Sequence, residues 1–203
     1  MTNADTYRSL LNKTYLEVVS ILLKKYGAAT DSYYSEKSYN RFKNGEIKTL
    51  SKRKISRTGE GLYCHHIDED KQILISQPKA ILKYDIPFDY QKQDRLVYCD
   101  LIEHAILHIL ISIESYKNRT IGQDSQAFGI GGYINYLRPE LIQWLVVGVV
   151  PTAPWRLNCL QRILMDKNEA IKLIEDMDTF LMKNYPISPE LIEEAYEKSL
   201  YII

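Results

Sequence analysis

The chain has 203 residues, of which 45% are hydrophobic, and its 26 basic side chains balance 26 acidic ones. This length and apolar content are sufficient for a core that folds without a partner. The balanced charge excludes a molecule-wide positive field, so any affinity for nucleic acid must come from local clusters. Three cysteines and the absence of a signal-peptide pattern predict a reducing, cytoplasmic location. No apolar run reaches the ~20 residues that a membrane-spanning helix needs.

Residues 1–47 are expected to form an N-terminal helical region. From Asp5 to Tyr26, apolar residues recur at steps of three and four, which is the period of an amphipathic helix, and Gly27 ends the pattern. A second, more polar helix is predicted from Asp31 to Lys43, before an Asn-Gly turn.

Residues 48–116 are expected to combine short strands with one buried helix. The helix predicted from Asp100 to about Ser115 is apolar on nearly every side, so it must lie in the core. Asp100 suits the N-cap position of this helix. The other elements predicted here are strands at Leu62–Ile67, Gln72–Ser76 and Arg95–Tyr98, and a short helical or irregular connection at Pro78–Lys83.

Residues 117–203 are expected to be a helical C-terminal region, within one compact domain overall. Four glycines between Asn118 and Asn135 predict a long irregular loop. Its segment Gly129–Gly132 lacks the Lys and hydroxyl residue that close a phosphate loop, so no chemistry is assigned to it. Helices are expected near Leu141–Val147, Asn158–Met165, Lys167–Lys183 and Ser188–Leu200.

A local cluster of positive charge precedes the most informative motif. Between residues 48 and 57 the chain has five basic side chains and no acidic one: Lys48, Lys52, Arg53, Lys54 and Arg57. A charge run of this kind is usually a solvated surface loop. Because this one leads directly toward a histidine pair, its members from Lys52 to Arg57 are also candidate contacts to the phosphates of a nucleic acid.

The four histidines fall into two pairs, His65 with His66 and His104 with His108. Neighbouring side chains on a strand point to opposite faces, so one member of the first pair can hold a metal while the other faces a substrate. On a helix, residues four apart share a face, so the second pair can present two imidazoles to one ion.

These segments resemble the HNH, or ββα-metal, nucleases, whose core is a strand carrying His-His, a second strand, and a helix carrying the last histidines. The segment Tyr63–Asp68 matches the first part, and Asp94–Val97 followed by the helical histidines matches the second. The nine-residue spacing of the family is kept between Arg95 and His104. The nearest pattern is that of the colicin-type nucleases. The resemblance implies an α+β chain in which a small ββα-metal core is embedded in mostly helical surroundings.

The resemblance further implies a metal-dependent endonuclease that hydrolyses phosphodiester bonds in DNA, although the balanced charge leaves RNA open. His65, His104 and His108 would bind a divalent ion, whether Mg²⁺, Mn²⁺, Ni²⁺ or Zn²⁺, and the ion would stabilise charge on the phosphate. His66 would be the general base, because a neutral imidazole near its unperturbed pKa of ~6.5 can accept a proton from water at neutral pH.

One position departs from the family pattern: Arg95 stands where the family has an Asn that orients the base. Arginine offers no hydrogen-bond acceptor to an imidazole, but it can contact a phosphate, which keeps Arg95 among the candidate catalytic residues. The departure leaves an alternative function open. In that alternative the chain is an HNH-like protein that has lost catalysis and binds or inhibits a partner in conflict between phage and host, with its helical regions as the surface for a protein partner.

Residues beside the histidines give two further alternatives for the metal site. The acidic turn Asp68–Asp70 could join the ion, although such a turn is usually solvated, and Asp68 is the member that the resemblance singles out. Cys64 or Cys99 could complete a closed, structural zinc site. This arrangement ranks lower, because the chain has no Cys-x-x-Cys pair.

Overall fold

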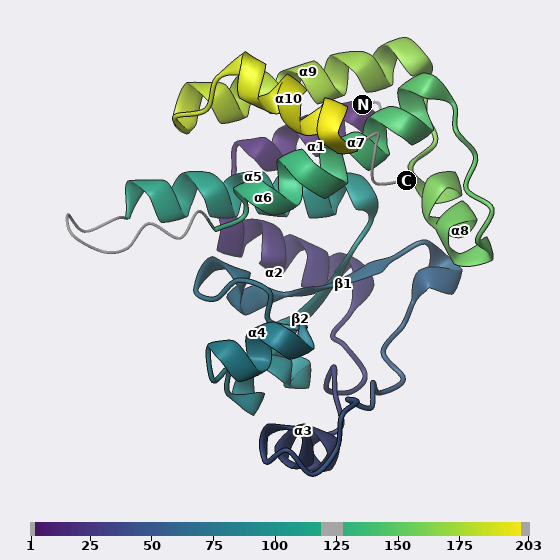
Figure 1. The fold of residues 1–203 in the computed structure, drawn as a ribbon. Helices are drawn as coiled ribbons and strands as arrows, with labels where there is room; N and C mark the ends of the chain where they lie inside the picture. The colour runs from purple at the N-terminus through teal and green to yellow at the C-terminus, as the bar shows by residue number, and fades with distance from the viewer. Residues whose placement is uncertain (1–2, 119–127, 200–203) are drawn as a thin grey trace.

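A two-stranded hairpin and a long helix stand at the centre of the molecule. The computed structural model describes residues 3–118 and 128–199, and within them the chain is mostly helical with one small antiparallel sheet. Strand β1 (Tyr63–His66) pairs with β2 (Leu96–Cys99), and α5 (Leu101–Lys117) follows β2 after the single residue Asp100. Figure 1 shows α5 below a layer of helices and above one further helix and the hairpin, with two short helices at the bottom. This architecture agrees with the predicted α+β class.

The sequence of α5 explains its central position. Asp100 and Glu103 form a capping box, in which the Asp100 side chain accepts a bond from the backbone N of Glu103 (2.9 Å) and the Glu103 carboxylate accepts one from the backbone N of Asp100 (2.8 Å). Of the 17 residues of α5, 11 are buried. A helix that is apolar on nearly every side needs cover on every side, and helices from both ends of the chain supply it. The predicted burial of this helix and the capping role of Asp100 are both confirmed.

The N-terminal region contains two helices rather than the single one predicted from Asp5 to Tyr26. Helix α1 (Asn3–Leu11) is separated from α2 (Tyr15–Tyr26) at Thr14, whose side chain caps α2 in a capping box with Glu17. This local start signal interrupts an apolar periodicity that continues across it. Helix α1 packs on α5 and on α9 (Lys167–Asn184), whereas α2 packs on α5 and β2.

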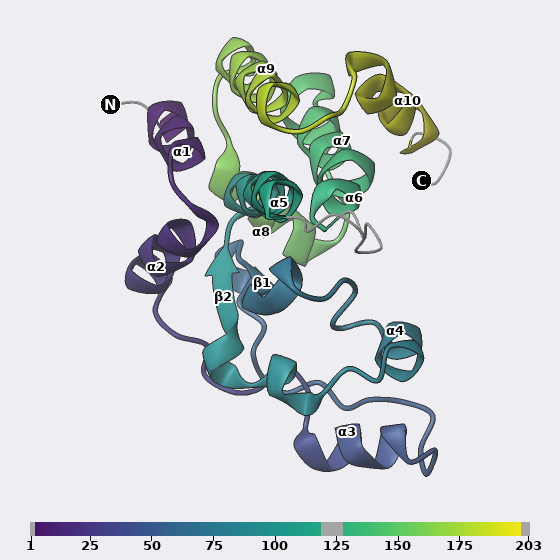
Figure 2. The ribbon, with the colours of Figure 1, turned by 90° about the vertical axis from the view of Figure 1, so that its left-hand side faces the viewer.

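The C-terminal region becomes helical earlier than predicted. The prediction of a loop from Asn118 to Asn135 is wrong for its last residues, because the chain is helical from residue 130 to residue 147. Residues 119–127 of that loop lie outside the described part of the chain. The remaining helices lie close to the predicted segments, and Figure 2 shows α9 and α10 above α5.

No described helix combines the length and apolar character needed to cross a membrane. The elements are α6 (Ile130–Gly132), a wider π-type stretch (Tyr133–Leu137), α7 (Arg138–Leu141), a second such stretch (Ile142–Val147), α8 (Pro154–Ile163), α9 and α10 (Pro189–Ser199).

A second, smaller hydrophobic cluster packs below the hairpin and joins α3 (Glu36–Lys43) to α4 (Pro78–Lys83). Helix α3 is shorter than the predicted helix from residue 31 to residue 43, because Tyr34 is extended and forms an isolated bridge with Lys52. The strand predicted at residues 72–76 is a turn, and β1 pairs only with β2 within the described residues. Short 3-10 helices complete this part of the chain: η1 (Thr58–Glu60), η2 (Ile67–Asp70), η3 (Phe88–Gln91) and η4 (Gln93–Arg95).

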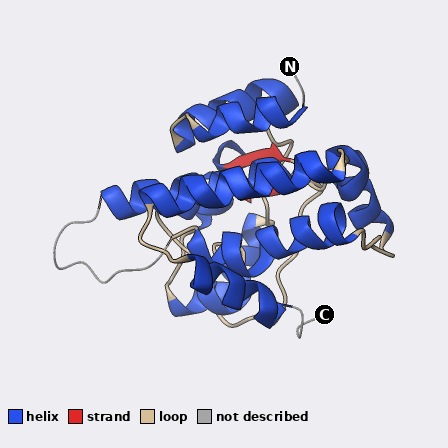
Figure 3. Ribbon diagram, turned by 90° about the horizontal axis from the view of Figure 1, so that it is seen from above, coloured by secondary structure: helices blue, strands red, loops and turns tan. Residues whose placement is uncertain are grey.

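The two faces of the hairpin meet different surroundings. Because strand side chains alternate, His65 shares one face with Val97 and Cys99, whereas His66 shares the other with Leu96 and Tyr98. The first face packs into the main core under the helices, which cover the sheet in the view from above (Figure 3). Leu96 and Tyr98 on the second face belong to a separate small cluster. Adjacent histidines are thus directed into different parts of the molecule.

Candidate metal centre

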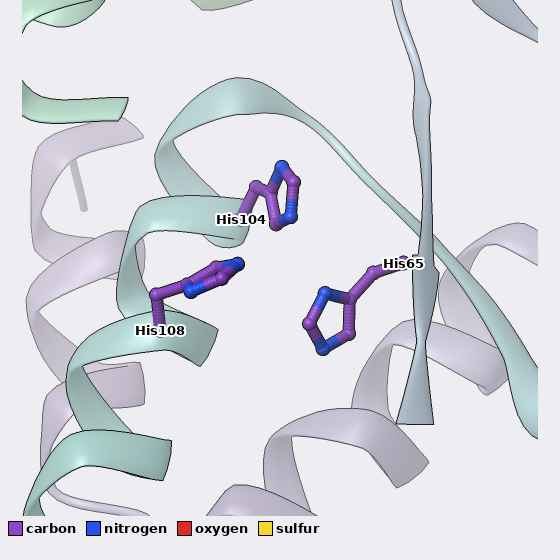
Figure 4. Close-up of side chains that lie close together, drawn as sticks. All are labelled: His65, His104 and His108. Atoms are coloured by element: carbon purple, nitrogen blue, oxygen red, sulfur yellow. The ribbon is translucent and has the colours of Figure 1, made fainter. Parts of the chain in front are cut away.

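Three histidines converge between β1 and α5. His65 comes from the strand, and His104 and His108 come from successive turns of the helix. Each ring contributes one nitrogen to a group of three nitrogens that all lie within 4.8 Å of one another. Figure 4 shows the rings around a common space, and their centroids are 4.9 to 5.5 Å apart. The residues expected to be metal ligands are therefore brought together, and they form a group that can hold a metal ion.

The contacts of His65 leave one of its ring nitrogens for a metal. The Tyr15 hydroxyl donates its one hydrogen to the carbonyl oxygen of Ile67 (2.8 Å), so its oxygen accepts from His65 Nε2, 3.0 Å away. The lone pair of His65 is then on Nδ1, which is buried and has no hydrogen-bond partner. A buried acceptor without a partner is costly. A metal ion would satisfy this one, so the donor set fits such an ion.

His108 is oriented by a second outer contact. Its Nδ1 lies 3.0 Å from the carbonyl oxygen of Gly129, which can only accept, so Nδ1 carries the proton and Nε2 carries the lone pair. Metal-binding histidines commonly use their second nitrogen in this way. His104 packs its ring against Tyr63, with centroids 5.8 Å apart, and its Nδ1 is buried without a partner.

Burial keeps these imidazoles neutral. Desolvation lowers the pKa of His65 and His104 well below the usual value, and repulsion by neighbouring imidazoles lowers both pKa values further. Desolvation also lowers the pKa of His108 to about 4. A metal binds the neutral form of imidazole, so no proton has to leave these rings at neutral pH before an ion can bind.

Glycines from the C-terminal region form a wall of the site. Gly132 has no room for a side chain, because a Cβ atom there would overlap the ring of His108. Gly129 has a φ of +76°, which favours glycine, and a Cβ there would meet the backbone of His108. Both glycines line a cavity of about 490 Å³ that also reaches His104, His108 and Glu69. The glycine segment, to which the sequence analysis assigned no chemistry, therefore lies against the histidine group.

His66 lies apart from this group and is not among the residues that line the cavity. It is only 2% exposed, and its ring packs on Tyr33 with centroids 4.6 Å apart. Its Nε2 is 3.2 Å from Oε1 of Gln91, whose Nε2 donates to the carbonyl oxygen of Ile75 (2.9 Å). This second bond fixes the amide, so His66 Nε2 is the donor and Nδ1 is left as the acceptor. Burial lowers the pKa of His66 to about 4, so the expectation of a base near its unperturbed ~6.5 is wrong and the imidazole is a weaker base than expected.

Gln91 is a residue that sequence reasoning missed. It is fully buried in the short helix η3, four residues before Arg95, and it is the residue that supplies an amide oxygen to His66. A glutamine among charged and aromatic neighbours gives no signal of burial in the sequence, because its partner His66 is distant along the chain.

Arg95 is turned toward an acidic residue. Its guanidinium lies 3.5 Å from Oδ1 of Asp68, which is 1% exposed and also accepts a bond from Lys71 (2.6 Å). Asp68 therefore anchors two cations and does not join the three imidazoles within 4.8 Å. The Arg95 side chain remains 46% exposed, which leaves it able to meet a phosphate.

Two members of the basic cluster form ion pairs with acidic residues. Arg57 pairs with Glu60 and lies over the ring of Tyr98, and Arg53 pairs with Asp31 (2.7 Å). Lys48 and Lys54 are exposed. Lys52 is also exposed, and its ammonium lies 4.9 Å from the centre of the Tyr33 ring. The same ring packs against His66. Lys52 is thus the member of the cluster with a connection to the histidine motif.

Neither candidate cysteine joins the histidines. Cys64 and Cys99 are free thiols, and the metal-holding group found among the described residues contains no cysteine. Burial raises the pKa of the Cys64 thiol to about 12 and that of Cys99 well above its usual value, which disfavours the thiolate that zinc would require. The mixed Cys/His zinc site is not formed.

Comparisons of the chain with family models, with curated proteins and with solved structures gave no match. Function is therefore inferred from the geometry of the metal centre and its surroundings.

Proposed function

We propose that the protein is a metal-dependent endonuclease of the ββα-metal type. The observation that carries this proposal is the order of elements around the three histidines. A strand, its antiparallel partner and an immediately following helix contribute one imidazole from the first strand and two from the helix. This order, and the four-residue spacing on α5, are what the resemblance to the HNH nucleases leads us to expect.

The donor set favours some ions over others. Imidazole nitrogen suits Zn²⁺ and Ni²⁺, whereas Mg²⁺ prefers oxygen ligands and retains several waters. His65, His104 and His108 would hold the ion, and the outer contacts from Tyr15 and Gly129 direct two of the three lone pairs. When bound, the ion would supply Lewis-acid stabilisation of negative charge on a phosphate.

His66 is the proposed general base. It is neutral at neutral pH, and the hydrogen bond to Gln91 leaves its Nδ1 as the proton acceptor. The resemblance assigns an orienting amide to position 95, where arginine cannot serve. In this proposal the Gln91 amide performs that function, and Arg95 is free to contact a phosphate.

DNA is the proposed substrate, held by cations on the side of the hairpin that carries His66. Lys52 lies over Tyr33, which contacts His66, and Arg95 lies beside Asp68, whose charge acts on the same imidazole. Because the chain is neutral overall, binding would depend on a few such contacts. Each phosphate contact would still make the affinity fall as salt increases.

Cleavage of supercoiled plasmid tests this proposal. The purified protein is incubated with Zn²⁺, Ni²⁺, Mn²⁺ or Mg²⁺, beside the variants His66→Ala and His108→Ala and a chelator control. We expect nicking by the wild type that is lost in both variants and after chelation. A folded, metal-loaded wild type that cuts neither DNA nor RNA with any of these ions would contradict the proposal.

A binding or inhibitor protein is the second candidate function. The burial of His66 and its absence from the cavity lining favour it, because a base has to reach the substrate. Such a protein would use its helical regions to bind a protein partner, as in conflict between phage and host. It would bind that partner equally well as the wild type and as His66→Ala.

A further inference from the structure

A carboxylate lies beside the three histidines. Glu69 belongs to the short helix η2, which follows β1 directly, and its Oε2 is 3.4 Å from His108 Nε2 and 3.9 Å from His65 Nδ1. The two nitrogens are the ones that the outer contacts with Gly129 and Tyr15 leave with lone pairs. Glu69 thus faces the space between His65 and His108, and it lines the cavity with His104 and His108. It is not part of the group in which all ligand atoms lie within 4.8 Å of one another, so its carboxylate would have to move closer to join an ion held by all three imidazoles.

Glu69 differs from the other acidic residues around it in facing the imidazoles, although Asp70 also has a buried oxygen, Oδ1, without a hydrogen-bond partner. Asp68 accepts a bond from Lys71, and Glu114 accepts one from the backbone N of Tyr15. Within the described residues, Glu69 forms no ion pair with a lysine or an arginine, and its close contacts are the two imidazoles. A side chain that is only 24% exposed, with a carboxyl group against two nitrogen lone pairs, needs positive charge between them, which either a metal ion or a proton on the carboxyl group can supply.

The distance from Glu69 to His108 is the one that a shared ion would require. Two ligand atoms ~2.0–2.1 Å from one ion at a tetrahedral angle lie roughly 3.3 Å apart. Oε2 of Glu69 and Nε2 of His108 are 3.4 Å apart, which matches that separation. His65 Nδ1, buried without a hydrogen-bond partner, lies on the same side at 3.9 Å.

We propose that Glu69 is the fourth protein ligand of the metal centre, which makes it a site of three imidazoles and one carboxylate. With four protein ligands, a phosphate would reach the ion only as a fifth ligand, which zinc sites can accept. This inference rests on the metal site of the proposed function but not on cleavage of DNA. A carboxylate ligand would neutralise one charge of a divalent ion, and it would extend the range of ions that bind toward those that accept oxygen, such as Mn²⁺.

Zinc affinity tests the assignment without any assay of activity. Zn²⁺ is titrated into the full chain in competition with a chromophoric chelator, for the wild type, Glu69→Gln and the matched variant Asp70→Asn. Asp70 is the adjacent acidic residue, and it lies within 4.0 Å of none of the three metal-binding imidazoles. We expect Glu69→Gln to weaken Zn²⁺ binding by roughly tenfold or more and Asp70→Asn to leave it nearly unchanged.

Cobalt absorption and a second variant complete the test. Co²⁺ in place of Zn²⁺ reports its ligands through its visible absorption, so Glu69→Gln is expected to change that spectrum. Glu69→His supplies a different donor at the same position and is expected to recover part of the lost Zn²⁺ affinity. Equal Zn²⁺ affinity and an unchanged Co²⁺ spectrum in a folded Glu69→Gln protein would overturn the proposal. A wild type that cuts no DNA but loses Zn²⁺ affinity in Glu69→Gln would support the ligand and refute the nuclease.

Discussion

The two faces of β1 place neighbouring histidines in contrasting environments. His65 faces the main core, where Tyr15 from α2 and His104 and His108 from α5 surround it. His66 faces the other side and meets Tyr33 and Gln91. The His65 ring is surrounded by other imidazoles, and its Nδ1 has no hydrogen-bond partner. The His66 ring is instead held by a hydrogen bond to the Gln91 amide. The contrast teaches that a single strand can direct two adjacent imidazoles into separate environments, of which only one contains a group of described residues that can hold a metal ion.

The largest expected effect concerns Zn²⁺ affinity, which should depend on the residues on the His65 side of β1 and not on those on the His66 side. His108→Ala removes a ligand, so we expect Zn²⁺ affinity to fall by at least about 100-fold, whereas His66→Ala should leave it within a few-fold of the wild type. The same difference should appear as stability, because Zn²⁺ at ~100 times its Kd stabilises the folded state by about 2.7 kcal/mol. Chelator competition and thermal unfolding with and without Zn²⁺ measure both. Equal loss of affinity in the two variants would show that the faces are not separate.

The next effect should appear on the other face, as a loss of stability without a loss of metal affinity. Gln91→Leu leaves the Ile75 carbonyl and His66 Nε2 without their partner, and a buried group without a partner costs about 1–3 kcal/mol. Urea unfolding of the variant measures the cost. The control is Gln93→Leu, which removes an amide from the same segment that bonds the Ala29 carbonyl and not His66.

The outcome of that comparison also bears on His66 itself. If His66 is the base and Gln91 positions it, Gln91→Leu should slow nicking while Gln93→Leu retains it. A variant that loses stability but cuts DNA at the wild-type rate would limit Gln91 to a structural role.

Local spacing made part of the fold and of the site predictable. The shared helix face of His104 and His108 and the opposite directions of His65 and His66 depend only on residues a few positions apart, so helix and strand periodicities predicted them. The choice of His65 rather than His66 as a ligand came from the resemblance to the HNH nucleases. The buried helix and the cap at Asp100 followed from equally local patterns.

The rest depends on contacts between distant parts of the chain. Tyr15 approaches His65 because α2 packs on β2, and Gly129 and Gly132 contact His108 although they lie more than 20 residues after it in the sequence. The prediction of a single N-terminal helix is wrong because the capping box at Thr14 begins a new helix, although the apolar periodicity continues across it. No pattern within a short window contains these contacts, so the sequence alone could not supply them.

The smallest expected effect tests whether the outer contact of His65 matters to the metal. Tyr15→Phe removes the acceptor for His65 Nε2, so the ring loses the contact that fixes its tautomer, and we expect Zn²⁺ affinity to fall about tenfold. Tyr39→Phe is the matched control, because Tyr39 is equally buried and its hydroxyl also donates to a backbone carbonyl, that of Ile86, in the cluster below the hairpin. Tyr39→Phe should lose about 1 kcal/mol of stability with its one hydrogen bond, and Tyr15→Phe about twice that with its two. Only Tyr15→Phe should also weaken Zn²⁺ binding, and an equal Zn²⁺ affinity in the two variants would mean that packing alone holds His65 in place.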